Sequence, residues 1–184
     1  MSTWYQNQLT NRNYLSPIGF LFVLDKARKT SFLCQKATIP TLSLGEYNIQ
    51  TGLVPIPVEG NLAFGSLIID FIVDEDLKNY MEIHNWMRAL GAPDDIETNR
   101  LALYSDPLDE GTDQRYSDAT LQVLNNNNIA NFNVIFKNLF PVEISSIPFD
   151  VTGTDNNFFI ATATFNYVSY EIRNVGSTER RKSW

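Results

Sequence analysis

The run 73–93 (VDEDLKNYMEIHNWMRALGAP) most constrains the fold, because it is one well-delimited helix in a sequence that otherwise has the pattern of strands. Acidic residues at 74–76 suit the first turn, where they place negative charge at the positive end of the helix dipole. Gly91 and Pro93 prevent its continuation. The sequence therefore predicts one helix, over 75–90, in a chain that otherwise forms mainly β structure.

A helical wheel divides this helix into two faces. The apolar face contains Leu77, Tyr80, Met81, His84 and Met87, and the opposite face contains Glu75, Lys78, Glu82 and Ala89. Trp86 falls on the polar side. A tryptophan there is either a contact with another protein or a side chain that a loop of its own subunit covers.

Few residues have the chemistry of an active site. His84 is the only histidine, and its place on the apolar face favours a hydrogen-bonded core residue over a base or metal ligand. Cys34 is the only cysteine, which excludes an intramolecular disulfide and favours a buried structural thiol over a nucleophile. The carboxylates at 74–76 are interpreted as helix caps rather than as metal ligands or an acid–base pair.

The sequence also lacks the motifs of common enzymes. It has no GxGxxG or GxxxxGK[ST] phosphate loop, no GxSxG elbow and no HExxH. The acidic run DPLDEGTDQ lacks the spaced ligands and closing glutamate of an EF-hand. We therefore predict a protein that is not an enzyme and that binds no cofactor or metal.

Length and hydropathy predict one soluble domain over 1–184, since 184 residues suffice for one substantial core. The polar N-terminus lacks the regions of a signal peptide, and no apolar run approaches the roughly 18 residues that span a bilayer. We expect neither export by a signal peptide nor membrane insertion.

Charge is unevenly distributed along the chain. The formal net charge of -7 disfavours general nucleic-acid binding, but residues 70–118 contain 13 acidic and 4 basic side chains, so the acidity is local. Basic residues gather at Lys26, Arg28 and Lys29 and in the tail 174–184. This segregation suits a protein whose opposite faces meet different neighbours, and solvated loops account for it nearly as well.

The first half of the chain predicts strands that end in the helix. Residues 19–39 have the pattern of a β-hairpin with a basic tip. Residues 41–58 begin as a loop and become an extended strand, whose two prolines place it at a sheet edge or in an irregular pairing. Residues 59–61 predict a turn into a strand over 62–73.

The second half begins with a long acidic loop over 92–119, which could reach a neighbouring subunit. Two strands around an asparagine-rich turn follow over 119–146, and the longest strand is predicted over 158–172. Its packed face would contain Phe159, Ala161, Ala163, Phe165 and Tyr167, with Thr162, Thr164 and Asn166 on the other face. A polar face on so long a strand suits a sheet shared between subunits.

The order of these segments resembles the tail tube proteins of contractile-tailed bacteriophages. The resemblance rests on FLCQKATIPTLSLG, VPIPVEGNLAFGSLIIDFIVDEDLKNYMEIHNWMRALG, FKNLFPVEISSIPFD and ATATFNYVSYEI, and it covers about residues 14–173. It leaves out an N-terminal arm, 1–13, and the basic tail, 174–184. The same architecture is similar to the haemolysin-coregulated protein of type VI secretion.

The resemblance implies a mainly β fold, a β-barrel-like sandwich flanked by one helix. It also implies six copies in a ring and rings stacked into a hollow tube inside a contractile sheath. The strands around 48–58, 62–73, 131–137 and 158–172 would contribute to a continuous inner barrel, with the helix outside it. The implied partners are further copies of the chain, the sheath protein, and baseplate and tail-terminator proteins. DNA would pass through the lumen without sequence-specific binding, and the protein, made in the host cytoplasm, would reside in the virion tail.

Two surfaces are expected to contact partners. We expect the sheath to contact the outward side of the helix, through Glu75, Lys78, Glu82 and Trp86. We expect stacked rings to meet through opposite charges on the basic turn and the acidic loop, namely Lys26, Arg28, Lys29, Asp109, Glu110 and Asp113. The alternative for the second surface is two solvated loops.

Other functions stay open at this point. A baseplate or tube-end protein of the same fold would occupy one ring or a few, and partner-specific termini would suit it. An isolated binding or enzyme domain would require a pocket chemistry that the sequence does not show.

Overall fold

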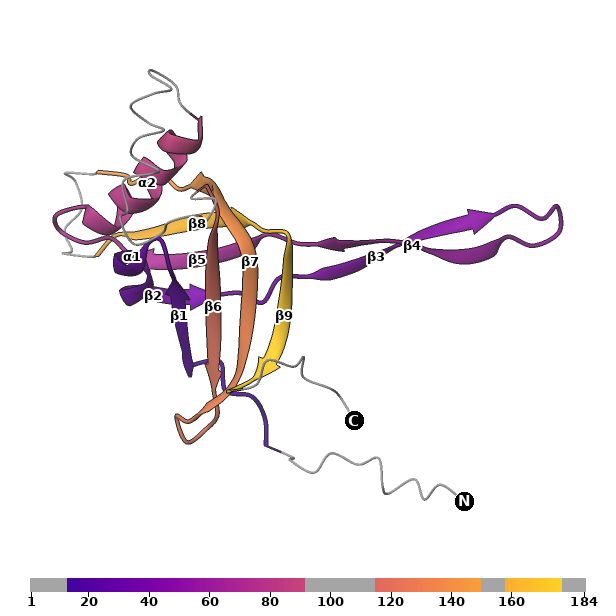
Figure 1. Ribbon diagram of the computed structural model, residues 1–184, viewed down its shortest axis with the longest axis horizontal. Coiled ribbons are helices and arrows are strands. Elements are labelled where there is room, and N and C mark those ends of the chain that lie inside the picture. Colours follow the sequence, from indigo (N-terminus) through magenta and orange to yellow (C-terminus); the bar gives the residue numbers. More distant parts are fainter. Residues whose placement is uncertain (1–12, 92–114, 150–157, 177–184) are drawn as a thin grey trace.

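The computed structural model describes residues 13–91, 115–149 and 158–176, which form a β-rich body with a long arm (Figure 1). The predicted mainly β fold with a flanking helix is confirmed, with a second, short helix added. The elements are β1 (Phe20–Leu24), α1 (Arg28–Phe32), β2 (Cys34–Ala37), β3 (Leu42–Ile49), β4 (Ile56–Phe64), β5 (Leu67–Ile72), α2 (Lys78–Gly91), β6 (Ser117–Leu124), β7 (Ala130–Ile144), β8 (Ile160–Asn166) and β9 (Ser169–Asn174).

One antiparallel sheet of seven strands forms the body. Its order is β1-β6-β7-β8-β5-β2, and β9 also pairs with β7. The first part of β7 pairs with β6 and β9, and its last part pairs with β8, so β7 joins two groups of strands that cross in Figure 1. Asn138 lies where β7 changes partner, with a φ of 53° that asparagine tolerates better than most residues.

The core lies between these two groups of strands. Alternate residues of β5 (Leu67, Ile69 and Phe71) and β8 (Ala161, Ala163 and Phe165) are fully buried, as the period of two requires. This confirms the central part of the packed face predicted for 158–172. Phe22 and Leu24 from β1 and Phe136 from β7 enter the same core. Ile83 and Trp86 of α2 cover it from one side.

The hairpin predicted over 19–39 is wrong. β1 pairs with β6 and β2 pairs with β5, so the two segments lie in different parts of the sheet. The predicted polar turn instead forms α1, where Thr30 is completely buried and its hydroxyl donates to the Asn79 carbonyl of α2 (2.9 Å). A buried tertiary contact thus outweighs the local hairpin pattern.

Other strand boundaries also differ from the predicted ones. The segment 158–172 is broken between β8 and β9, because the two strands pair with different parts of β7, and the 15-residue β7 is the longest strand. Residues 59–61 lie inside β4 rather than in a turn. β6 begins within the predicted loop 92–119, of which 92–114 lie outside the described residues. The asparagine-rich turn between β6 and β7 is confirmed.

The start of α2 is organised by a buried asparagine. The helix begins at Lys78, three residues later than predicted. The Asn79 side chain accepts from the backbone N–H of Asp74 (3.1 Å) and donates to the Ile72 carbonyl (2.7 Å). Residues 74–77 therefore form a turn rather than a first helical turn, and Leu77 takes a φ of 60° there.

Candidate assembly interface

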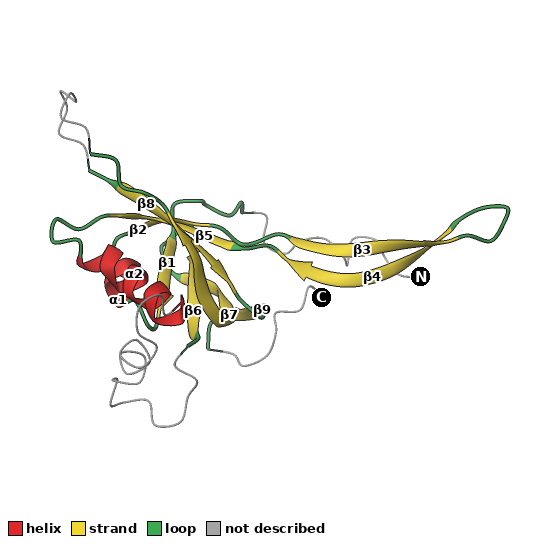
Figure 2. Ribbon diagram, turned by 90° about the horizontal axis from the view of Figure 1, so that it is seen from above, coloured by secondary structure: helices red, strands yellow, loops and turns green. Residues whose placement is uncertain are grey.

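The arm formed by β3 and β4 is the most exposed part of the described chain. Both views show it projecting from the body (Figures 1 and 2), and β3 and β4 pair only with each other. Every residue of β3 is exposed. The exposed large apolar side chains of the whole arm are Leu42, Leu44, Tyr47, Ile49, Leu53, Val54, Ile56 and Leu62. An apolar surface of this extent is characteristic of a protein–protein contact.

The register places the apolar side chains in cross-strand pairs. Leu44 pairs with Leu62 near the body, and Ile49 pairs with Ile56 near the tip. Because alternate residues of a strand face opposite ways, Leu44 and Ile49 lie on opposite faces of the ribbon. Each half of the arm thus carries an apolar stripe.

The change of face coincides with a bulge at two glycines. Gly60 lies so close to Gly45 that a Cβ at Gly60 would come within 2.9 Å of the Gly45 carbonyl oxygen. The pairing register shifts there, between Leu44 and Glu46. Glycine is required at this point because the two backbones approach closely, as bulges often demand.

Next to the bulge, two carboxylates face each other. Glu46 and Glu59 are directly opposite in the register, an arrangement that costs stability when both are charged. Within the described residues, neither carboxylate has an ion-pair or hydrogen-bond partner. The sequence contains no lysine or arginine from 38 to 77, so the arm has no basic side chain of its own.

Aromatic residues fix the base of the arm to the body. The Tyr167 hydroxyl donates to the Gly65 carbonyl (2.7 Å), and the Tyr170 hydroxyl donates to the Pro40 carbonyl (3.4 Å). The ring of Phe64 lies 5.5 Å from that of Tyr170, edge on. Burial, with a smaller contribution from Tyr170, raises the pKa of Tyr167 to about 12, so its hydroxyl stays protonated as a donor. These contacts set the direction in which the arm projects.

The helix faces differ from the predicted ones. Trp86 is 4% exposed, its ring lies 6.2 Å from that of Phe165, and its indole N–H donates to the Arg115 carbonyl (3.1 Å). The prediction that Trp86 lies on the outward face is therefore wrong. The alternative of a tryptophan covered by its own subunit is correct. Met81, expected on the core face, is exposed.

The helical wheel predicts the wrong buried face for α2, because the face that is buried includes a polar residue. Asn79, Ile83 and Trp86 are the buried residues of α2, spaced by four and three positions as one helical face requires. A helical wheel that assigns the buried face from apolar residues alone leaves out Asn79. It therefore places the predicted buried face too close to Met81. The expected sheath residues Glu75 and Lys78 do lie exposed on the surface.

Glu82 and Lys29, expected in two different interfaces, contact each other. The Lys29 ammonium lies 3.3 Å from a Glu82 carboxylate oxygen, and the Lys29 backbone N–H donates to the other oxygen (3.2 Å). The Lys26 ammonium lies 5.4 Å from the centre of the Trp86 ring, a cation–π distance. Of the predicted basic set, Arg28 alone has no partner within the described residues. Asp109, Glu110 and Asp113 lie outside the described residues.

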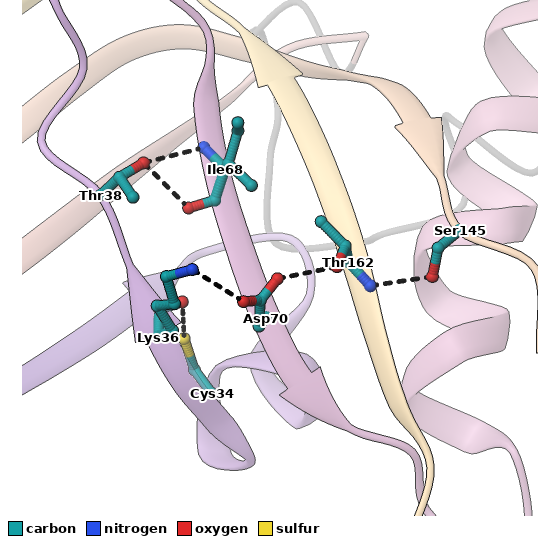
Figure 3. A network of polar contacts seen from close by, with 7 residues as sticks. All are labelled: Cys34, Lys36, Thr38, Ile68, Asp70, Ser145 and Thr162. Atoms are coloured by element: carbon teal, nitrogen blue, oxygen red, sulfur yellow. Dashed lines mark hydrogen bonds and ion pairs between the residues drawn. The ribbon is translucent and has the colours of Figure 1, made fainter.

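A polar network covers the outer side of β5 and β8 (Figure 3). Asp70 accepts from the Thr162 hydroxyl (2.8 Å) and lies 3.5 Å from the Lys36 ammonium. The Thr162 backbone N–H donates to the Ser145 hydroxyl (2.9 Å). Thr162 and Thr164 are half-buried here and Asn166 is exposed, which agrees with the polar face predicted for this strand.

The remaining candidates do not form a catalytic site. Cys34 is half-buried, and burial raises the pKa of its thiol to about 11, which keeps it protonated. His84 is half-buried, and its Nδ1 has no hydrogen-bond partner among the described residues, so the predicted hydrogen-bonded core histidine is wrong. The described segments contain no group of three or more potential metal ligands. None of their helices is long and apolar enough to cross a membrane.

Reasoning from the sequence missed the arm as an interface. It treated 41–58 as one extended strand at a sheet edge or in an irregular pairing. The segment instead contains β3, the tip of the arm and the start of β4, and these two strands pair with each other through a register shift between Leu44 and Glu46. One signal was present: a 40-residue stretch, 38–77, without a lysine or arginine, in which apolar residues alternate with polar ones. The edge strand of a protein that stays monomeric usually carries lysine or other charged side chains, which prevent it from pairing with another chain.

Solved structures with this fold belong to contractile assemblies. A chain of the anti-feeding prophage baseplate matches with a TM-score of 0.61 and 13% identity over 91% of this chain and 100% of that one. A chain of the sheath–tube complex of an extracellular contractile injection system matches with a TM-score of 0.59 and 13% identity over 95% and 100%. A chain of the anti-feeding prophage tube-terminating cap matches with 0.60 and 15% over 95% and 100%. At these identities the likeness shows the fold alone.

No curated protein sequence matches the chain. A family model described as phage tail tube protein matches residues 8–173, which is most of the length. This match covers the arm, both helices and all strands up to the last residues of β9. The chain therefore belongs to the phage tail tube protein family, whose members are structural components of tails.

Proposed function

We propose that this protein is the major tail tube subunit, which polymerises as stacked hexameric rings inside a contractile sheath and forms the channel for DNA ejection. The observation that carries the proposal is the apolar arm of β3 and β4, in a chain that belongs to the tail tube family. An isolated subunit would leave this surface in water, and burial of its side chains against other copies would contribute about 25 cal/mol per Å².

The surface of α2 supports a contact on the outside of the tube. Its exposed side includes Lys78, Met81 and Asn85, preceded by the exposed Glu75. We propose that Glu75 and Lys78 contact the sheath, as expected from the sequence. Glu82 supports this contact indirectly, since it holds α1 against α2, and Trp86 stabilises the helix from inside.

The acidic net charge of the chain suits a channel that DNA passes through. Affinity for phosphate comes chiefly from lysine and arginine, and the chain has a net charge of -7. On the outer side of the strands, Lys36 is paired with Asp70, and Arg173 with Glu171. Such compensated charges would let DNA move without sequence-specific binding.

A tube-end protein of the same fold is the second candidate. Chains from a baseplate and from a tube-terminating cap share the fold as closely as a chain from a sheath–tube complex. A protein of this kind would form one ring or a few, at the baseplate or the terminator.

Size-exclusion chromatography and negative-stain electron microscopy of the purified full chain distinguish these candidates. Open-ended tubes of stacked rings are the result expected for a major tube subunit. Single rings that do not elongate would favour the tube-end protein. A monomer at every concentration would overturn both proposals.

A further inference from the structure

A second exposed apolar surface lies at the end of the body opposite the arm. Phe32 is 89% exposed at the C-terminal end of α1, and Phe158 and Ile160 are exposed at the start of β8. The segments that carry them meet at one end of the sheet. There the Ile72 backbone N–H donates to the Leu33 carbonyl (3.0 Å), and Ile72 pairs with Ile160. We call Phe32, Phe158 and Ile160 the aromatic end.

Next to the aromatic end lies an uncompensated cation. Arg28 and Phe32 are four residues apart on α1 and both are exposed, so they lie on one side of that helix. Lys29 is bound to Glu82, and Lys26 lies over Trp86, whereas Arg28 has no interaction with any described residue. This surface therefore combines apolar side chains with one available positive charge.

The arm has the complementary combination. It offers apolar pairs on both sides of an uncompensated carboxylate pair, Glu46 and Glu59, and it has no basic residue. A guanidinium between the two carboxylates would remove their mutual repulsion and could form charge-assisted hydrogen bonds with both. Charge complementarity of this kind fixes register between surfaces that apolar contact alone would let slide.

The arm and the aromatic end cannot meet within one copy. In both views the tip of the arm and α1 lie at opposite ends of the molecule (Figures 1 and 2). The nine residues of β4, at about 3.3 Å each, give the arm a reach of roughly 30 Å away from its own body. A contact between two different surfaces of identical chains is heterologous, and it repeats from copy to copy into a closed ring or an extended array.

From these observations we propose that the arm of one copy docks on the aromatic end of a second copy of this chain. Arg28 binds between Glu46 and Glu59, and Phe32 packs on the Leu44–Leu62 pair, which lies on the same face of the arm as Glu46. The proposal rests on the proposed function, in that it names the surfaces through which this tube subunit binds its neighbour. It replaces the acidic loop with the arm as the partner of the basic turn.

A charge exchange tests this contact in the full-length chain. Glu46→Arg with Glu59→Arg, and separately Arg28→Glu, should each raise the protein concentration needed for assembly at least about tenfold, by sedimentation and negative-stain microscopy. The combination of all three should restore assembly most of the way to that of the unchanged chain. Restoration cannot result from misfolding, so it identifies the pair directly.

A matched control uses Arg88, which is exposed on α2. Arg88→Glu should leave self-assembly within about twofold of the unchanged protein, and it should not rescue the arm variant. Normal assembly by Arg28→Glu, or rescue by Arg88→Glu, would overturn the docking contact while the tube function stands. If the unchanged chain itself never assembles, the proposed function fails first.

Thiol cross-linking gives a second, geometric measurement. In a Cys34→Ser background, Phe32→Cys and Leu44→Cys together should give covalent ladders of many copies under mild oxidation, because each copy offers both ends of the contact and Leu44 lies on the same face of the arm as Glu46. Either cysteine alone should give at most dimers. Assembled particles without ladders, even with a short flexible bis-maleimide, would contradict the contact.

Discussion

Lys29 and Glu82 join α1 to α2 through both a side chain and the backbone. The ammonium lies 3.3 Å from one carboxylate oxygen, and the Lys29 backbone N–H donates to the other (3.2 Å). Glu82 is only about one-fifth exposed, whereas Lys29 is largely in solvent. The backbone hydrogen bond is therefore the part of this contact that water competes with least.

Glu82→Gln should lower the free energy of unfolding by about 1 kcal/mol, because it removes the charge from both interactions while it keeps the shape. Urea denaturation at low salt measures this loss. Lys78→Gln, which breaks the fully surface-exposed pair with Asp76, is the matched control and should change stability by less than about 0.5 kcal/mol. Equal losses would show that the backbone contact adds nothing.

Trp86→Ala should destabilise the subunit itself, by about 3–5 kcal/mol, because it opens a cavity beside Phe165 and leaves the Arg115 carbonyl without its donor. Thermal and urea unfolding of the variant test this expectation. Met81→Ala, on the exposed side of the same helix, should cost less than about 1 kcal/mol. A stable Trp86→Ala subunit that fails only in sheath binding would instead restore the outward interpretation.

Gly60→Ala should impair assembly far more than stability. Its Cβ would meet the Gly45 carbonyl at 2.9 Å and force the bulge to shift, but the arm contributes no buried core residue. We expect a melting temperature within about 3 °C of the unchanged protein and a clear loss of polymer by sedimentation. Gly91→Ala is the control, since a Cβ there meets no atom within 4 Å. If both variants assemble alike, the shape of the bulge does not matter.

Cys34 should resist alkylation in the folded protein. Burial raises the pKa of its thiol from 9.0 to about 11, so at pH 8 the reactive thiolate should be about 100-fold scarcer than in the unfolded chain. Iodoacetamide labelling with and without urea, followed by mass spectrometry, measures this ratio. Similar rates in both states would contradict it.

The same shift has a consequence for stability. The folded thiol has the higher pKa, so its contribution is fully present below about pH 9 and is lost as the pH rises toward about 11. A Cys34→Ser variant should lack this component of the alkaline decline in the free energy of unfolding. An identical decline in both proteins would assign it to other groups, such as Tyr167.

Much of the fold followed from local pattern. The existence of α2 followed from the acidic residues that precede it and from the Gly–Pro sequence that ends it, and the turn between β6 and β7 followed from a run of asparagines. The buried positions of β8 followed from strict alternation. Local chemistry suffices for these features because each is set by residues within a few positions of one another.

The pairing of strands that are distant in the sequence could not be predicted from local pattern. The patterns of 20–24 and 34–37 fit a hairpin as well as they fit two separate strands, and only their partners β6 and β5 decide between them. The residues predicted for the two interfaces were misassigned for the same reason. Lys29 and Glu82 were assigned to different partners, although the packing of α1 on α2 brings them together.

By itself, therefore, the sequence determined the class of each main element, the alternation of buried and exposed residues, and the resemblance to tail tube proteins that the family match supports. Only the tertiary structure decided which side of α2 is buried, because that depends on Asn79 satisfying backbone groups of a neighbouring strand end. It also decided that β3 and β4 leave the body as an arm. Their apolar residues have the same pattern as those of core strands, and what differs is that no other described element covers them.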